Sequence, residues 1–261
     1  MPESNRSITI DFNCDMGEGV GSDGSIMPFI SSANIACGYH AGNKDSIAKT
    51  VALAIQHQVA IGAHPSFKDK ENFGRNEMDL PIEEIYSLVT DQIRMIDRVA
   101  KSQGAILHHV KPHGALYNMS AKNAVIAKTI ARATMDYDMN LVLYGLSGSY
   151  SISEARNRGL KTASEVFADR TYQDDGSLTP RSEANALIEN PDEVVKQVLQ
   201  MIKEGLMTTV SGKKIPIFAE TFCIHGDGNY AVEFTKRIHD ALKKEKINIC
   251  CIGKKSGAGD E

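Results

Sequence analysis

Residues 107–118 read LHHVKPHGALYN. The apolar run at the start is typical of a β-strand, and it ends in Lys111, Pro112, His113 and Gly114 before a helical stretch begins. A strand that closes in polar residues and a glycine turn, and then leads into a helix, is the repeat unit of a β/α barrel. In that fold the C-terminal strand ends meet on one face, which carries the chemistry. The segment therefore predicts a barrel with Lys111 and His113 at its functional face.

The same ending recurs at three other places, where an apolar run stops at a histidine wrapped in glycine or proline. These runs are ANIACGYHAG (33–42, with His40), VAIGAHPS (59–66, with His64) and FCIHGDGN (222–229, with His225). One histidine at a strand end is more often structural than functional, but four at four strand ends favour a shared site. Histidine serves as a general acid or base near neutral pH and as a common metal ligand.

A fifth run, ITIDFNCDMGEG (8–19), ends in carboxylates instead. Alternation along a strand puts Asp11, Asn13 and Asp15 on one face. Asp11 lies inside an apolar run, where a buried charge is costly without a partner. We therefore favour a metal site or a general base over the alternative, a solvated loop in which Asp15 or Glu18 caps a turn.

Strand-like and helix-like segments alternate along the whole chain, which predicts an α/β fold with a mainly parallel sheet. The strands are expected near 7–12, 33–37, 59–63, 106–110, 140–144, 161–167, 217–224 and 247–252, and the helices over 43–58, 80–103, 121–135, 149–158, 191–204 and 229–244. An open doubly wound sheet fits less well, because polar residues follow nearly every strand and do not gather at one switch point.

Length and composition suit one soluble domain. The 261 residues match a barrel of roughly 250, so we expect a single domain over 1–261 with flexible ends at 1–6 and 253–261. A net charge of −4 and the short basic clusters argue against a nucleic-acid partner. No apolar stretch is long enough for a membrane helix. Five cysteines, mostly in apolar runs, indicate reduced thiols and a cytoplasmic protein.

Two long polar segments interrupt the pattern, at 67–80 and at 168–185, and long loops at this face of a barrel usually bind or cover ligands. The second belongs to the stretch SEVFADRTYQDDGSLTPR (164–181). Its acids and arginines either form a surface salt-bridge network or bind a substrate carboxylate, for which arginine has bidentate geometry. A lysine at a strand end, such as Lys111, can hold an anion or polarise a carbonyl.

These segments resemble the LamB/YcsF family, whose members are assigned as the A subunit of prokaryotic 5-oxoprolinase. The matching pieces are DFNCDMGEG, SSANIACGYHAG, AIGAHPSFKDKENFGR, HVKPHGALYN, SEVFADRTYQDDGSLTPR and HGDG, in the family's order from about residue 10 to residue 228. The resemblance implies a distorted, seven-stranded TIM-like β/α barrel related to the glycoside hydrolase/deacetylase superfamily. It also implies that ATP with Mg²⁺ drives the opening of the 5-oxoproline lactam to L-glutamate, and that 5-oxoprolinase subunits B and C are required.

The matching positions define the candidate site. We expect catalytic roles for Asp11, Asp15, Glu18, His64, Lys111, His113 and Asp169, and substrate contacts from Asn13, His40, Glu165, Arg170, Arg181 and His225. A divalent metal, if bound, is expected on Asp15, His40 and His64, although no HExxH or CxxC spacing supports one. The alternatives are a metal-dependent deacetylase or amidohydrolase that acts alone, and a non-catalytic subunit that binds 5-oxoproline for its partners.

Overall fold

The structure, a computed structural model, describes residues 8–226 and 230–254. The predicted flexible end 1–6 lies outside the described residues, as does the other end apart from residues 253–254. In chain order the elements are β1 (Thr9–Met16), α1 (Asp23–Ile26), η1 (Met27–Phe29), β2 (Ser32–Ala36), α2 (Lys44–Gln56), β3 (Ala60–His64), α3 (Ile82–Ser102), β4 (Leu107–Val110), α4 (Gly114–Lys122), α5 (Ala124–Tyr137), β5 (Val142–Leu146), α6 (Tyr150–Asn157), β6 (Lys161–Phe167), α7 (Pro191–Glu204), β7 (Leu206–Thr208), β8 (Lys214–Pro216), β9 (Thr221–Ile224), α8 (Ala231–Lys244) and β10 (Asn248–Ile249).

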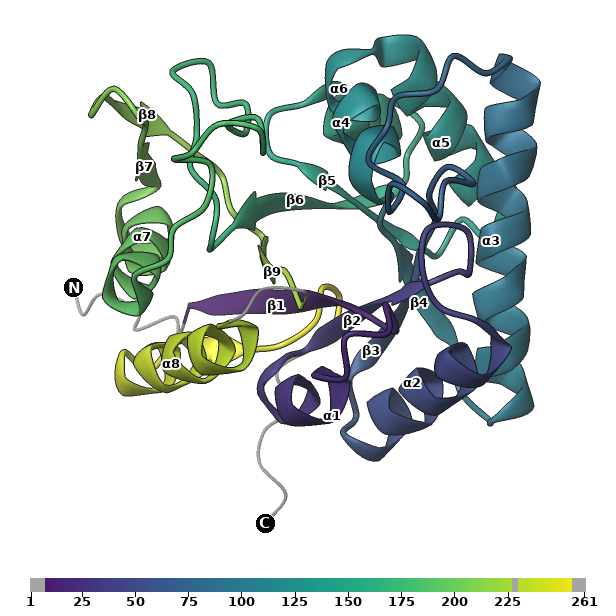
Figure 1. Ribbon diagram of the computed structural model, residues 1–261, viewed down its shortest axis with the longest axis horizontal. Coiled ribbons are helices and arrows are strands. Elements are labelled where there is room, and N and C mark those ends of the chain that lie inside the picture. The colour runs from purple at the N-terminus through teal and green to yellow at the C-terminus, as the bar shows by residue number, and fades with distance from the viewer. Residues whose placement is uncertain (1–7, 227–229, 255–261) are drawn as a thin grey trace, which may run out of the picture.

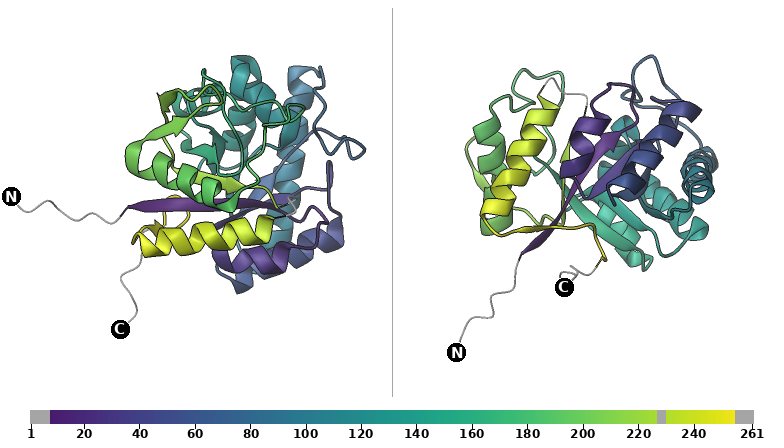
Figure 2. Two further views of the ribbon diagram at one scale, coloured as in Figure 1. Left: turned by 60° about the vertical axis from the view of Figure 1, so that its left-hand side comes forward. Right: turned by 90° about the horizontal axis from the view of Figure 1, so that it is seen from below.

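Seven parallel strands close into a barrel in the order β1-β2-β3-β4-β5-β6-β9, because β9 pairs with both β6 and β1 (Figure 1). The predicted seven-stranded barrel is therefore confirmed. Strand β10 adds to β1 outside the closed ring, and β7 and β8 form a separate antiparallel pair. Helices surround the strands, and Figure 2 shows α8 and α1 along the outside of β1. No helix in the described part of the chain is long and apolar enough to cross a membrane.

The two faces of the barrel strands carry different chemistry. On β1 the side chains of Phe12 and Cys14 belong to the hydrophobic core, while Asp11 and Asn13, which alternate with them, are buried among polar side chains of other strands. Alternation puts these two sets on opposite faces of the strand. The large apolar core therefore lies between the barrel wall and the helices, and the barrel interior is polar.

Local sequence signals account for most element boundaries. Asn43 caps α2 by accepting from the backbone N–H groups of the first turn, and α7 has the predicted bounds. The helix predicted over 121–135 is wrong at its start. The chain forms α4 and α5 instead, and Asn123 between them caps α5. The strand predicted over 217–224 is also wrong at its start, because β9 begins at Thr221.

Candidate active site

The C-terminal ends of the barrel strands bring most of the predicted residues together at one end of the barrel, which we call the mouth. Those on or at the end of a strand are Asp15 of β1, His64 of β3 and Glu165 of β6, and those just beyond a strand are His40, Lys111, His113 and His225. All of them except His225 are buried. Ionisable side chains buried this thoroughly need partners, so their contacts define the site.

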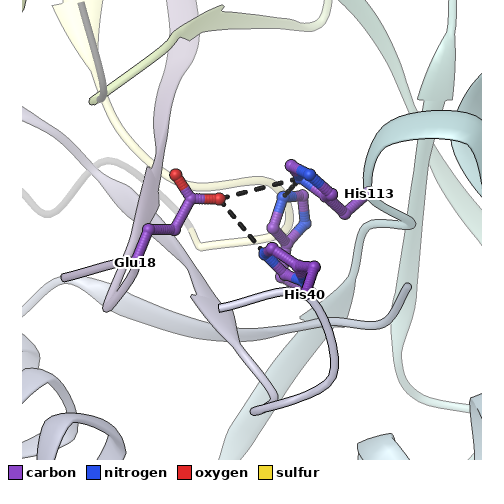
Figure 3. A group of neighbouring side chains, drawn as sticks. Glu18, His40 and His113 are labelled. Atoms are coloured by element: carbon purple, nitrogen blue, oxygen red, sulfur yellow. Dashed lines mark hydrogen bonds and ion pairs between the residues drawn. The ribbon is translucent and has the colours of Figure 1, made fainter. Parts of the chain in front are cut away.

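Four of these side chains form a compact group at the mouth: Glu18, His40, His64 and His113. One ligand atom from each lies within 4.8 Å of all the others. Glu18 Oε1 is 3.2 Å from His40 Nε2 and 3.7 Å from His113 Nδ1 (Figure 3), and His113 Nδ1 is 2.9 Å from His64 Nε2. The His40 and His113 rings stack with their centroids 3.9 Å apart. We call these four residues the histidine cluster.

In each cluster histidine, one ring nitrogen points toward the other cluster residues and the other, outer nitrogen points away from them. Each outer nitrogen contacts an oxygen that acts as a hydrogen-bond acceptor. His64 Nδ1 donates to the backbone oxygen of Lys111 at 2.7 Å, and His113 Nε2 donates to that of Phe73 at 2.9 Å. His40 Nδ1 lies 2.9 Å from Ser66 Oγ, whose own proton goes to the oxygen of Phe67. These partners place a proton on every outer nitrogen.

The inner nitrogens converge on one point, and those of His40 and His113 do so as electron-pair donors. Burial lowers the pKa of His40 to about 3 and that of His113 well below its usual value, with help from neighbouring His64, so both are neutral and their inner nitrogens carry no proton. His113 Nδ1 nevertheless lies 2.9 Å from His64 Nε2. Two lone pairs repel at that distance, so either a proton on His64 Nε2 or a metal ion must lie between the nitrogens.

The donor set fits a divalent metal ion. Three imidazoles and a carboxylate suit Zn²⁺, and their outer nitrogens are fixed by oxygens in the manner common to metal-bound histidines. The cluster contains His40 and His64 of the predicted metal set. Asp15 is not a member of the group, but its Oδ2 lies 3.3 Å from His64 Nε2.

A buried ionic network adjoins the cluster. Lys111 Nζ lies 2.9 Å from both Asp15 Oδ1 and Glu165 Oε1, and 2.9 Å from Cys223 Sγ. Burial opposes the charges of Lys111 and Asp15. The charge of Asp15 outweighs burial and holds the pKa of Lys111 well above its usual value, and the charges of His64 and then Lys111 hold the pKa of Asp15 well below its usual value. Together with Glu18, these carboxylates outnumber the Lys111 ammonium group beside the histidine cluster, and this local excess of carboxylates suits a bound cation.

His225 and Asp169 form a second reactive pair at the mouth. His225 Nδ1 is 3.1 Å from both carboxylate oxygens of Asp169, and the ring stacks on Phe167 with centroids 5.3 Å apart. Burial would raise the pKa of Asp169, but the charge of His225 outweighs it and the net shift is downward. An ionised Asp169 therefore holds the His225 proton on Nδ1 and leaves Nε2 able to accept or donate a proton.

Several of these groups line one cavity of about 390 Å³. Its wall includes Asp15, His64, Lys111, His113 and His225, together with Arg75, Lys122 and Arg181. Lys111 is paired with two carboxylates, and the guanidinium groups of Arg75 and Arg181 add further positive charge to the cavity wall. Arginine binds carboxylates with two parallel hydrogen bonds.

Several predicted site residues have mainly structural contacts. Arg170 is buried and donates to the backbone oxygens of Thr179 and Ala186, which folds the 168–185 segment back on itself. Burial, aided by the charge of Arg181, lowers the pKa of Arg170 to about 10. Asp11 lies roughly 13 Å deeper along β1 than Asp15. It accepts hydrogen bonds from Ser31, Ser32 and Thr221 and not from cluster residues.

Asn13 links the ionic network to the barrel interior. Its amide nitrogen donates to Glu165 Oε1 at 2.9 Å, and its oxygen accepts from Asn34 at 2.7 Å. Asn34 also donates to Asp15 and accepts from His109 Nε2, both at 2.8 Å. His109 thus orients an amide that holds Asp15.

Sequence reasoning missed residues that hold the cluster from outside. Ser66 and Phe73 contact His40 and His113, and Gln92 of α3 binds the backbone of Ser66. Gln92 is a fully buried polar side chain three residues after Val89, on the apolar face of its helix. A polar residue on an apolar helix face was the available signal.

The closed barrel first defines a fold class. The family 4 carbohydrate esterase from Streptomyces lividans in complex with acetate has a TM-score of 0.51 over 97% of this chain and 96% of that chain. Its sequence is only 11% identical to this chain, so this likeness concerns the fold alone. The chain is thus a β/α barrel of the kind found in carbohydrate esterases.

Sequence comparison then gives the family. The model of the LamB/YcsF family matches residues 10–257, and the chain belongs to this family. The 5-oxoprolinase A subunit of Geobacillus kaustophilus (strain HTA426) is 53% identical over 245 residues, which cover 92% of this chain and 96% of that protein. The lactam utilization protein from Thermus thermophilus has a TM-score of 0.87 at 39% identity and covers 93% of this chain and 99% of its own.

Proposed function

We propose that this chain is the ring-opening subunit of an ATP-dependent 5-oxoprolinase and that its histidine cluster holds a divalent metal ion. The names of the relatives support 5-oxoproline as the substrate. The dependence on ATP with Mg²⁺ and on subunits B and C comes from the family resemblance. The observation that carries the metal assignment is the convergence of inner nitrogens on one point beside Glu18.

The reaction adds water across the lactam C–N bond, so that one product carries both the new carboxylate and the freed amine of L-glutamate. A divalent ion in the cluster would supply Lewis acidity toward the carbonyl oxygen and would favour ionisation of water. ATP hydrolysis would offset the unfavourable opening of a stable, unstrained amide.

His225 is the proposed proton donor to the leaving lactam nitrogen. Its Nδ1 proton is held by Asp169, and its ring lines the cavity. Proton transfer by a positioned histidine contributes roughly 10²–10⁴-fold to the rate of such reactions. Asp15, which contacts both His64 and Lys111, stabilises positive charge at the mouth. Nε2 of a neutral His225 can accept the proton of the attacking water and then deliver it to the leaving nitrogen.

Arg181 and Arg75 are the proposed partners of the substrate carboxylate. Both line the cavity, and Arg75 packs its guanidinium over the Phe73 ring with 4.8 Å to the centroid. Arg170, expected from the sequence to bind substrate, already has two backbone acceptors. We therefore assign Arg170 to the shape of the loop that carries Arg181.

The direct test is glutamate release from 5-oxo-L-proline by the purified chain, alone and with subunits B and C, with and without ATP and Mg²⁺. The proposal predicts glutamate only in the full mixture. Full activity of the mixture with both His64→Ala and His225→Asn variants would instead make this chain a non-catalytic substrate-binding subunit.

A metal-dependent deacetylase or amidohydrolase that acts alone is the second candidate. The fold shared with a carbohydrate esterase and the histidine cluster favour it. Hydrolysis of acetylated sugars or simple amides by the isolated chain without ATP would support this function, provided that the full mixture releases no glutamate.

A further inference from the structure

Gln92 lies on α3, away from the strand ends, yet every polar atom of its amide is engaged. Its Oε1 accepts from the Ser66 backbone N–H at 3.0 Å. Its Nε2 donates to the Ser66 backbone oxygen at 2.9 Å and to the Leu88 oxygen at 3.0 Å. Both Gln92 and Ser66 are fully buried. One side chain thus fixes both backbone polar groups of Ser66 where water cannot replace it.

The side chain of Ser66, whose backbone Gln92 holds, contacts His40 of the histidine cluster. Its hydroxyl donates to the Phe67 backbone oxygen at 2.8 Å and therefore has only lone pairs left for His40 Nδ1 at 2.9 Å. With Ser66 as acceptor, His40 carries its proton on Nδ1, and its Nε2 lone pair then lies 3.2 Å from Glu18 Oε1, a repulsive contact that a metal ion between the two atoms relieves. The opposite tautomer would place a proton on Nε2, which would donate to Glu18 at 3.2 Å and occupy the position of a metal ion.

We propose that Gln92 is a positioning residue for the metal ion of the histidine cluster: it holds Ser66, and Ser66 selects the metal-binding tautomer of His40. This inference rests on the proposed function in that it takes the cluster to bind a divalent ion. Gln92 contacts neither the ion nor the substrate. Gln92 therefore affects ring opening only through the affinity of the cluster for the metal ion.

The test is Zn²⁺ affinity, measured on the metal-free full chain by competition with a chromogenic chelator. Ser66→Ala removes the hydroxyl, and Gln92→Met removes the amide with little change in side-chain length. We expect each variant to bind Zn²⁺ about 10–100-fold more weakly than the parent, the usual effect of losing a group that orients a metal ligand. The double variant should lose no more than the worse single variant, because both act through His40.

Ser120→Ala is the matched control. Ser120 is also buried, and its hydroxyl bonds Tyr117 and Ser151 and no cluster residue. This variant should bind Zn²⁺ like the parent, and thermal unfolding of each metal-free variant reports whether it is folded. Folded Ser66→Ala or Gln92→Met protein with parental affinity, or losses that add in the double variant, would overturn the positioning role. A parent chain that binds no divalent ion would overturn the cluster assignment itself.

Discussion

Protons on the cluster histidines are placed by oxygens outside the cluster. The backbone oxygens of Lys111 and Phe73 and the hydroxyl of Ser66 accept from the outer nitrogens. Burial then keeps His40 and His113 neutral in the folded chain. Neutral imidazoles with inward lone pairs can bind a metal ion without first losing a proton. Because these histidines resist protonation in the folded chain, the stability of the metal-free protein should fall in acid.

We predict that the metal-free protein loses stability as the pH falls below about 6.5, the usual value for histidine. The pKa values of His40 and His113 are lowered on folding, so the unfolded chain takes up protons that the folded chain does not. Stability is therefore full above about pH 6.5 and falls toward about pH 3 for His40, by at most about 1.4 kcal/mol per pH unit for each histidine. Urea unfolding between about pH 7.5 and 5.5 measures this slope.

The control for this slope is His239→Asn on α8, which should retain it, whereas His40→Asn should reduce it. An unfolding free energy of the parent that stays constant over the same interval would contradict the assignment of neutral imidazoles to the cluster.

His225→Asn should lower kcat for glutamate release in the full mixture by about 10²–10³-fold. The Asp169 carboxylate loses the imidazole that it orients, and the leaving nitrogen loses its proton donor. Zn²⁺ affinity should not change, because His225 is not part of the cluster. A variant that keeps parental kcat, or that loses metal instead, would remove His225 from the assigned role.

The 67–80 segment is packed against the cluster. Its Phe73 supplies a backbone oxygen to His113, and Gly74 accepts at 2.9 Å from the backbone N–H of Ala115 in the first turn of α4. A side chain at Gly114 would put its Cβ 2.4 Å from the Gly74 oxygen, and Gly114 also has a left-handed φ of +56°. Glycine is thus required where α4 meets this loop.

We predict that Gly114→Ala destabilises the metal-free protein by roughly 2–4 kcal/mol and weakens Zn²⁺ binding, because the loop must move away from His113. Gly148→Ala is the control, since Gly148 also has a positive φ of +76° but no atom would lie within 4 Å of its Cβ. It should cost only about 1 kcal/mol and leave Zn²⁺ affinity unchanged. Equal effects of the two substitutions on urea unfolding and metal binding would show that only backbone strain matters.

Local patterns in the sequence predict the barrel and the residues at its strand ends. They do not predict the residues that hold those side chains in place from outside the cluster. The alternation around Asp15 and the histidine endings at His40 and His64 are visible along single strands. The contact between Ser66 and Gln92 joins a loop to a helix, and no local pattern encodes it. The break at Asn123 was missed because apolar residues continue on both sides of it.

The whole barrel gathers the ends of six strands, β1, β2, β3, β4, β6 and β9, into one charged site. Closure through β9 brings His225, the partner of Asp169, to the cavity that also holds Asp15, His64 and Lys111. The apolar core between barrel and helices supports this polar interior, so the buried carboxylates can be held close together. The carboxylates and neutral imidazoles gathered at the histidine cluster favour binding of a cation there.

If the histidine cluster holds a metal ion that is required for catalysis, ring opening must stop when that ion is removed. The chain is stripped of metal with a chelator, the chelator is removed, and glutamate release is measured with untreated subunits B and C, ATP and Mg²⁺. We predict little glutamate from the stripped chain, recovery on adding about one equivalent of Zn²⁺ per chain, and no recovery with His64→Ala. Full activity of a chain shown to be metal-free would contradict a role for the ion in ring opening.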